Sequence, residues 1–288
     1  MPGAARMAML PDGRRLHLQH GPIDIVAEAF GEGAEVDAAY RQAGARFATI
    51  LDGLVAELAL LRRPLDRAKP ALEGPVARRM LSACWPHRAR FITPMAAVAG
   101  SVADEVLAAM TAGRSLARAY VNNGGDIAVH LSPGTALSAG VVNDPDRPGL
   151  DDRIVFGAER PARGMATSGW RGRSLSFGIA DAVTVLAGSA AAADAAATLI
   201  ANAVTVHHPA IERAPASSLR EESDLGERLV TVAVGSLPEN TKSAALDAGL
   251  AQARAMQAAG LIDSARLALQ GESRALAPAE PVGATMAA

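Results

Sequence analysis

The sequence GMATSGWRGRSLSFGIADAVTVLAGSAAAADAAATLIANAV, residues 164–204, decides the expected fold because it predicts a loop, a strand and a helix in succession. Residues 179–187 are β-branched and almost wholly apolar, which is typical of a buried strand. Gly188 and Ser189 break the strand and offer a helix N-cap. The Ala-rich residues 190–204 have strong helix propensity. The stretch therefore predicts a helix that follows a buried strand.

Two polar residues, Asp194 and Thr198, interrupt the predicted helix at its centre. Because they are four residues apart, both side-chain oxygens project from one face of the helix. In one interpretation Asp194 faces solvent and the Thr198 hydroxyl bonds back to the carbonyl of residue 194. In the other, the carboxylate and the hydroxyl bind Mg²⁺ or Ca²⁺, and phosphates and waters complete the shell. The sequence leaves both interpretations open.

Two glycine-containing segments are candidates for binding an anion. Residues 164–173 combine Gly, Thr and Ser with two arginines, a composition suited to this role. The strand-like residues 117–122 run into Asn123-Gly124-Gly125-Asp126, where a glycine turn allows backbone amides to approach a phosphate or a ring. Most such turns are only turns, so the second segment alone is a weak motif.

Composition narrows the class of protein. Half of the 288 residues are apolar but only 3% are aromatic, which predicts a tightly packed core with few rings. A net charge of −2 gives no electrostatic reason to expect a nucleic-acid partner. Cys84 is the only cysteine, so neither an intrachain disulfide nor a Cys-based zinc site is expected. The sequence shows no secretory apolar segment and no membrane span, and we expect a cytoplasmic protein.

Strands and helices alternate irregularly along the chain, which is typical of the α+β class with helices packed on mixed sheets. We expect a single domain over residues 1–276, or two intimate subdomains, followed by a disordered tail at 277–288. Residues 143–152 and 205–225 are expected to be loops. The predicted strands are 16–18, 23–30, 117–122, 127–131, 137–142, 153–158, 229–234 and 264–269, and the predicted helices are 35–61, 76–84, 95–111 (with Thr93 as N-cap) and 241–259.

Four short blocks occur in order: AAVAGSVADEVL at residues 96–107, NNGGDIAVH at 122–130, ATSGW at 166–170 and ADAAAT at 193–198. The last three resemble the GGDI, TSG and AD-x-x-x-T blocks of the ApbE superfamily, the flavin transferases that move FMN from FAD onto a Ser or Thr of a target protein. The first resembles the small-residue helix that lends a backbone carbonyl to the metal in that family. The whole chain, with its LPDGRRLHLQHGPIDI opening, looks closer to an uncharacterised ApbE-like branch than to the transferases.

The resemblance implies an ApbE-like α+β fold, a Mg²⁺ site and FAD as substrate or ligand. It implies Mg²⁺ binding by Asp194 and Thr198, a nucleotide lined by Gly124, Gly125 and Asp126, and phosphates approached by Thr167, Ser168 and Gly169. Arg171 and Arg173 are suited to the same phosphates by their chemistry, although they belong to no family motif. His207 and His208 are candidates for the general base, because His titrates near neutral pH; the alternative is that they are solvated loop residues.

The chain also departs from the family. The His-Ile-Ile-Asp-Pro-x-Thr-Gly segment of the transferases is replaced by residues 170–179, and Gly100 stands near the place of the usual Lys. Two functions therefore stay open: a Mg²⁺-dependent enzyme that processes a flavin or nucleotide, with a protein acceptor, or a binding module of the same fold without chemistry. A structural protein with a degenerate site is a third. A homodimer is the expectation from base rates.

Overall fold

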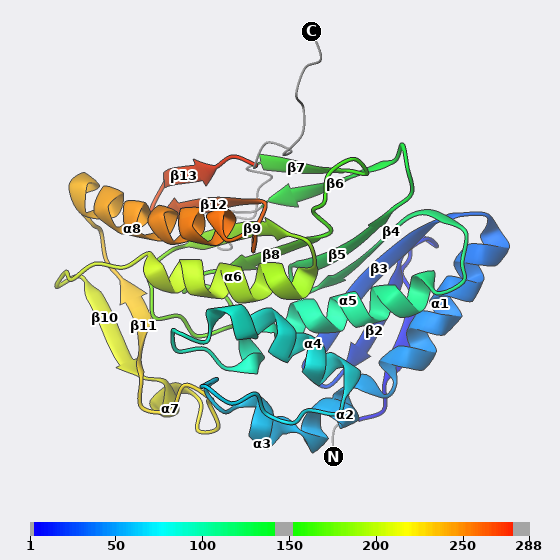
Figure 1. Cartoon of the computed structure of the whole chain (residues 1–288), viewed down its shortest axis with the longest axis horizontal. Helices are drawn as coiled ribbons and strands as arrows, with labels where there is room; N and C mark the ends of the chain where they lie inside the picture. The colour runs from blue at the N-terminus through cyan, green and yellow to red at the C-terminus, as the bar shows by residue number, and fades with distance from the viewer. Residues whose placement is uncertain (1–2, 142–151, 279–288) are drawn as a thin grey trace, which may run out of the picture.

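The structure is organised around a nine-stranded sheet with a layer of helices on one face (Figure 1). The computed structural model describes residues 3–141 and 152–278. The predicted loop at 143–152 and tail at 277–288 lie almost wholly outside these residues. Strand order is β1-β2-β3-β4-β5-β8-β9-β12-β13, and all neighbouring strands run antiparallel. The predicted α+β class is confirmed.

The strands of the large sheet follow one another along the chain with few crossovers. They are β1 (Arg6–Met9), β2 (Leu16–His20), β3 (Ile23–Gly31), β4 (Leu116–Asn123), β5 (Asp126–Leu131), β8 (Gly164–Ser168), β9 (Ala182–Ala187), β12 (Ser264–Leu269) and β13 (Glu272–Leu276). Two separate antiparallel pairs are formed by β6 (Ala136–Val141) with β7 (Asp152–Gly157) and by β10 (Ile211–Pro215) with β11 (Leu229–Val234).

The α-helices range from 4 to 20 residues in length, and four of them cover the sheet. The α-helices are α1 (Gly33–Phe47), α2 (Ile50–Ala56), α3 (Leu58–Leu61), α4 (Pro75–Cys84), α5 (Val98–Thr111), α6 (Ala190–Ala203), α7 (Ala216–Leu219) and α8 (Glu239–Ala258). Two 3₁₀ turns, η1 (Trp85–His87) and η2 (Pro94–Ala97), flank the connection between α4 and α5.

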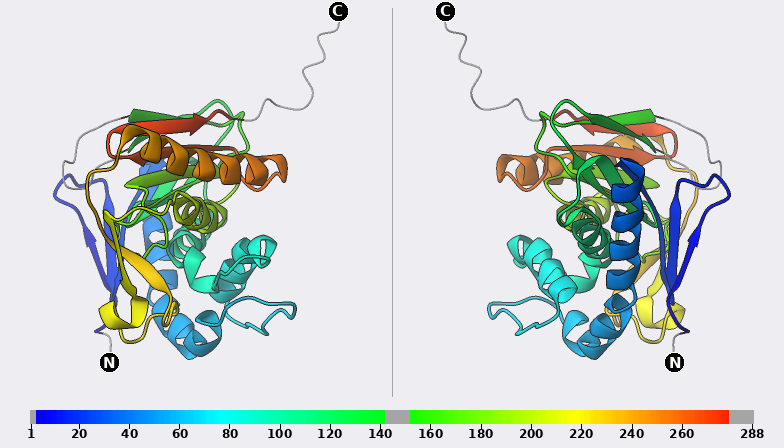
Figure 2. Two further views of the ribbon diagram at one scale, coloured as in Figure 1. Left: turned by 90° about the vertical axis from the view of Figure 1, so that its left-hand side faces the viewer. Right: turned by 90° about the vertical axis from the view of Figure 1, so that its right-hand side faces the viewer.

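Helix α6 lies at the centre of the helical layer. It packs on β8 and β9, with α5 on one side and α8 on the other, while α5 covers β4 and β5 and α8 covers β12 and β13. Figure 2 shows α8, α6 and α5 following one another down the same side of the molecule. Most of the alanines of α6 are fully buried. Their small side chains let α6 approach both the sheet and its neighbours closely.

The two faces of the sheet have separate apolar cores. On β5, Ala128 belongs to the main core under the helices, whereas Val129 and Leu131 belong to a smaller cluster with Phe156 of β7. Because side chains alternate along a strand, Asp126 lies on the helical face with Ala128. The sheet therefore presents Asp126 to α5 and α6.

The predicted helix at 35–61 is wrong in its continuity, because the chain forms α1, α2 and α3 instead. At the first break the Thr49 hydroxyl donates to the Arg46 carbonyl (3.1 Å), and the Thr49 amide bonds the same carbonyl. This local bonding competes with the helical i to i−4 pattern. At the second break the Glu57 carboxylate accepts hydrogen bonds from the amides of Glu73 and Gly74. Its side chain therefore binds the segment that precedes α4 instead of continuing the helix.

Three other boundaries differ from the prediction. Thr93 does not cap a helix: its hydroxyl bonds Asp224, a 3₁₀ turn follows, and α5 begins only at Val98. Residues 164–168 form strand β8 rather than a loop, because they pair with β5 and β9. Residues 205–225 are not a continuous loop, since they contain β10 and α7. These contacts join segments that are distant in sequence, so the residues at each boundary carry no local sequence pattern that predicts them.

Among the described residues, none of the helices combines the length and the apolar character that a membrane crossing requires.

Candidate functional site

The turn between β4 and β5 places Asp126. Gly124 and Gly125 have φ angles of +66° and +111°, which only glycine adopts without strain. The Asn122 side chain accepts the Gly125 amide (2.8 Å), and the Asn123 side chain donates to the Ala99 carbonyl (3.0 Å). The turn is thus fixed against the start of α5, and Asp126, the first residue of β5, is buried beneath it.

The N-terminal end of α6 places Asp194. Ser189 caps the helix by accepting the Ala192 amide (3.2 Å), as the sequence predicted. The Asp104 carboxylate of α5 accepts two further amides at this end, those of Ala190 and Ala191 (3.1 and 3.0 Å). Four helix-terminal amides lack intrahelical partners, so Asp104 satisfies two of them and joins α5 to α6.

Gly100 is the closest point between α5 and α6. A Cβ atom at this position would lie 2.3 Å from the Ala190 carbonyl oxygen, so no side chain fits there. The Gly100 amide donates to Asp194 Oδ2 (3.0 Å), and the Ala99 amide also bonds this carboxylate. The tight crossing leaves no room at Gly100 for a side chain such as the Lys that is usual near this place in the ApbE family.

The carboxyl groups of Asp126 and Asp194 share a hydrogen bond. Burial raises the pKa of Asp126 well above its usual range, and the charge and hydrogen bond of Asp194 raise it further. Burial also raises the pKa of Asp194, to about 7, against the lowering effect of its hydrogen bonds. Two carboxylates this close cannot both ionise easily without a cation. Asp194 is therefore half-buried and bonded by the Gly100 amide and the Asp126 carboxyl group, rather than a side chain that faces solvent alone.

Thr198 lies one turn beyond Asp194 on α6 and is half-buried. In the part of the chain that the structure describes, its hydroxyl has no hydrogen-bond partner, and the predicted bond back to the carbonyl of residue 194 does not form. A free hydroxyl on the same helix face as a carboxylate can bind a hard cation.

The TSG residues divide between the two faces of the sheet. The Thr167 amide donates to the Asp126 carboxylate, but the Thr167 hydroxyl bonds Thr184 (2.9 Å) on the face opposite the helices. By strand alternation Ser168 lies on the same face as Asp126. Gly169 is required by packing, because a Cβ atom there would lie 2.3 Å from the Asp181 carbonyl oxygen. The block therefore supports Asp126 chiefly through its backbone.

Arg171 and Arg173 have different surroundings although both come from the segment that replaces the family's missing block. Arg171 Nε donates to Asp181 Oδ1 (3.0 Å), so its charge is paired. Arg173 is exposed, and its guanidinium lies over Gly124, where a Cβ atom would come within 1.9 Å of it. Its positive charge reaches Asp126. Only Arg173 is placed beside the carboxyl pair.

His207 and His208 lie beyond the C-terminal end of α6, whereas Asp194 is in its first half. Nine residues of helix separate Asp194 from Ala203, which corresponds to about 14 Å along the axis. His208 Nδ1 accepts the Ala210 amide (3.1 Å) and so belongs to a local turn. Within residues 3–141 and 152–278, no hydrogen bond joins either histidine to Asp126 or Asp194, and the structure does not bring these predicted residues together.

The carboxyl pair offers the oxygen donors that a divalent cation would require. The described residues hold no group of three or more His, Cys, Asp or Glu side chains arranged for a metal ion. A hard cation here would take oxygens from Asp126, Asp194 and Thr198 and complete its shell with water or phosphate oxygens, which is the ligand set Mg²⁺ prefers. Asp126 was predicted to line the nucleotide, and its pairing with Asp194 was not predicted because the contact joins β5 to α6, which are distant in sequence.

Comparison with known proteins identifies the family. The UPF0280 protein of Methanopyrus kandleri is 40% identical over 147 residues, which cover 50% of this chain and 56% of the relative. The UPF0280 protein of Methanothermobacter thermautotrophicus is 36% identical over 174 residues, covering 57% of this chain and 62% of the relative. The chain thus spans less than two thirds of these curated relatives. A family model described as "AbpE bacteria" matches residues 7–275, and the chain therefore belongs to this bacterial AbpE family.

Proposed function

We propose that this protein is a Mg²⁺-dependent enzyme that binds FAD and cleaves its diphosphate, passing FMN to a Ser or Thr hydroxyl of a protein acceptor. The observation that carries the proposal is the hydrogen-bonded pair of Asp126 and Asp194, with the unpaired Thr198 hydroxyl beside it and Arg173 above it. Family membership supports the same assignment, and the ApbE resemblance supplies the substrate.

In this proposal each residue has a separate task. Asp126, Asp194 and Thr198 hold the cation, which when bound neutralises charge on the diphosphate oxygens. The glycine turn at Gly124 and Gly125 allows phosphate oxygens to approach the backbone, because no side chain intervenes. Arg173 donates hydrogen bonds to a phosphate from the opposite side.

The reaction requires the acceptor oxygen to attack the phosphorus of the FMN half, while the bond to the AMP half breaks and AMP leaves. The chain's contribution is to position the diphosphate and to stabilise the charge that develops on it. The backbone amides of Gly100 and Ala99 bond the Asp194 carboxylate and keep it oriented. A fixed carboxylate holds its ligand without reorganisation during the reaction.

A binding module without chemistry is the second candidate. Among the described residues no histidine bonds the carboxyl pair, and the family's His-containing segment is replaced by residues 170–179. Such a protein would bind FAD and Mg²⁺ with the same residues but would release no AMP.

Calorimetric titration with FAD, FMN and ADP, with and without Mg²⁺, tests both candidates when combined with chromatographic detection of AMP. We expect Mg²⁺-dependent FAD binding that is lost in Asp194→Asn and retained in Asp52→Asn, an exposed helical control. AMP release in the presence of an acceptor supports the enzyme, and tight binding without AMP supports the module. If none of the three ligands binds in the presence of Mg²⁺, both candidates are wrong.

A further inference from the structure

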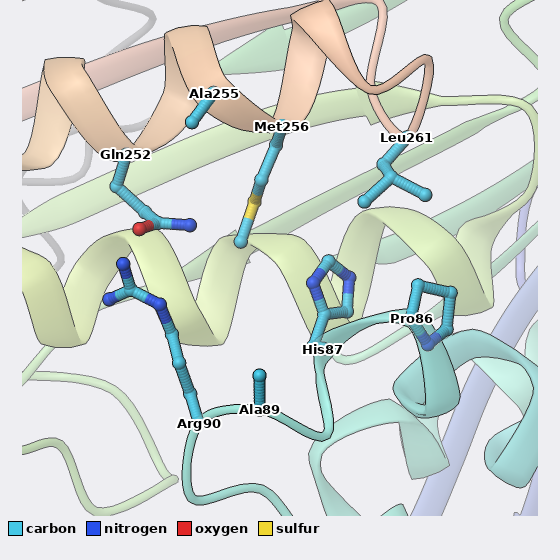
Figure 3. Close-up of a pocket in the computed structure, with 8 residues that line it drawn as sticks. All are labelled: Pro86, His87, Ala89, Arg90, Gln252, Ala255, Met256 and Leu261. Carbon is cyan, nitrogen blue, oxygen red and sulfur yellow. The ribbon is translucent and has the colours of Figure 1, made fainter.

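A cavity whose lining includes neither Asp126 nor Asp194 lies between the residues that follow α4 and the last turns of α8 (Figure 3). Its volume is about 180 Å³. An engineered cavity of roughly 150 Å³ holds a benzene molecule, so this space is sufficient for a small organic ligand. Three polar side chains line it, His87, Arg90 and Gln252, together with the apolar side chains of Ala255, Met256 and Leu261.

His87 is a largely buried residue whose ring nitrogens are open to the cavity. Its side chain lines the cavity with a residue exposure of 9%, and in the part of the chain that the structure describes neither ring nitrogen makes a hydrogen bond. Because the ring nitrogens are open to the cavity, they are available to bond a ligand or a water there. Burial and, secondly, the charge of Arg90 lower the pKa of His87, which makes the ring neutral at neutral pH, with one donor and one acceptor nitrogen.

Arg90 supplies a positive charge at the mouth of the cavity. Figure 3 shows its guanidinium reaching towards Gln252 of α8, on the other side of Met256 from the His87 ring. No carboxylate pairs with Arg90 among residues 3–141 and 152–278. The neighbouring Arg88 differs, because its guanidinium lies 4.5 Å from the centre of the Trp85 ring and bonds the Trp85 carbonyl.

The positive charge of Arg90 favours an anionic ligand, and the other side chains that line the cavity restrict which anions fit. One guanidinium and one neutral imidazole match a single negative charge, and a guanidinium binds the two oxygens of a carboxylate side by side. Met256, between the polar groups, and Leu261 offer thioether and aliphatic surface that favours a hydrocarbon body. A phosphate dianion would place its second charge against this surface, which is unfavourable.

We propose that this cavity binds a small monocarboxylate with a short aliphatic body. The carboxylate binds the Arg90 guanidinium, with the Gln252 amide as a further donor, and the aliphatic body packs on Met256 and Leu261 towards the His87 ring. This site is independent of the carboxyl pair and of the reaction proposed there.

The test uses the full chain labelled with ¹³C at histidine, titrated with butanoate, acetate and inorganic phosphate and followed by NMR. We expect butanoate to shift the His87 signal saturably and acetate to bind about tenfold more weakly, because two methylene groups are lost. Arg90→Gln should weaken butanoate binding about tenfold or more through loss of a charge-assisted hydrogen bond. Arg88→Gln is the matched control and should leave the affinity unchanged.

A second variant tests the location. Ala255 is exposed at the cavity wall, so Ala255→Phe fills the space from the surface without disturbing the core, and it should abolish the butanoate shift. The proposal is overturned if millimolar butanoate leaves the His87 signal unchanged, if Ala255→Phe binds normally, or if Arg88→Gln and Arg90→Gln weaken binding equally. Binding of phosphate in preference to butanoate would overturn the assigned ligand class.

Discussion

Asp126, buried at the start of β5, and Asp194, half-buried in the first half of α6, share a hydrogen bond between their carboxyl groups. The contact joins the sheet to the helical layer at one point. A buried pair of like charges is costly to ionise, whereas a divalent cation between the two groups removes that cost. The pairing predicts the behaviour of Asp194→Asn, which keeps the shape of the side chain and removes its negative charge.

Asp194→Asn should abolish stabilisation by Mg²⁺ without destabilising the apo protein. Asparagine keeps the oxygen that accepts the Gly100 amide, and the variant removes one buried carboxylate from the pair. A ligand that binds the native state at 100 times its Kd stabilises by about 2.7 kcal/mol, and this stabilisation is measurable as a rise in Tm. Thermal unfolding with and without Mg²⁺ checks the prediction, with Asp52→Asn as control. A Mg²⁺-dependent rise retained in Asp194→Asn would contradict it.

Gly100→Ala should destabilise the protein by about 2 kcal/mol or more, because overpacking forces helices apart. The added Cβ atom would lie 2.3 Å from the Ala190 carbonyl oxygen, and relief of the clash must separate α5 from α6. Gly53→Ala is the matched control: Gly53 is exposed in α2 with no atom near its Cβ position, so the substitution should stabilise by about 0.5–1 kcal/mol. Urea denaturation measures both, and equal effects would show that the close crossing is not rigid.

The central unit of the fold could be predicted from the sequence because its signals are local. The strand now seen as β9, the Ser189 cap and the Ala-rich α6 all follow from propensity and turn residues. The glycine turn before Asp126 was predicted for the same reason, and its two positive φ angles agree. Strand β8 was missed because five residues of mixed polarity become a strand only by pairing with β5 and β9.

The candidate site was predicted residue by residue but not as an arrangement. Asp126 was assigned to the nucleotide and Asp194 to the metal, and only the packing of α6 on β5 brings them into contact. His207 and His208 were chosen for their chemistry, yet helix length places them far along α6 from the pair. Arg171 and Arg173 look equivalent in sequence, and they differ because Asp181 pairs with the first alone.

Arg173→Ala should weaken FAD binding about tenfold and leave Mg²⁺ binding in the absence of nucleotide nearly unchanged. The guanidinium lies over Gly124 and is suited to a charge-assisted hydrogen bond with a phosphate, whose loss has about this effect. Calorimetric titration in the presence of Mg²⁺ gives the comparison. Arg254→Ala, at an exposed position of α8, controls for the loss of one surface charge, and an equal effect of both variants would argue against a specific role.

Cys84 should be inert towards thiol reagents in the folded protein. The thiol is buried at the end of α4, and burial raises its pKa well above the usual range, so almost no thiolate is present at neutral pH. We expect reaction with an aromatic disulfide reagent only in denaturant, at the rate of a free thiol. Rapid modification of the native protein would show that α4 opens locally.

Glu105→Gln should destabilise the protein most at neutral pH and progressively less in acid. Burial raises the pKa of Glu105, but hydrogen bonds and charge from Arg46 (2.8 Å) and Arg79 (3.1 Å) outweigh it, and the net pKa is lowered. A lowered pKa stabilises the native state above the unfolded pKa, near 4.3, and this stabilisation is lost as pH falls through the folded value. We expect a cost of about 1–3 kcal/mol near neutral pH. Urea denaturation across this range checks it, with exposed Glu221→Gln as control, and a pH-independent cost would show that packing, not charge, is responsible.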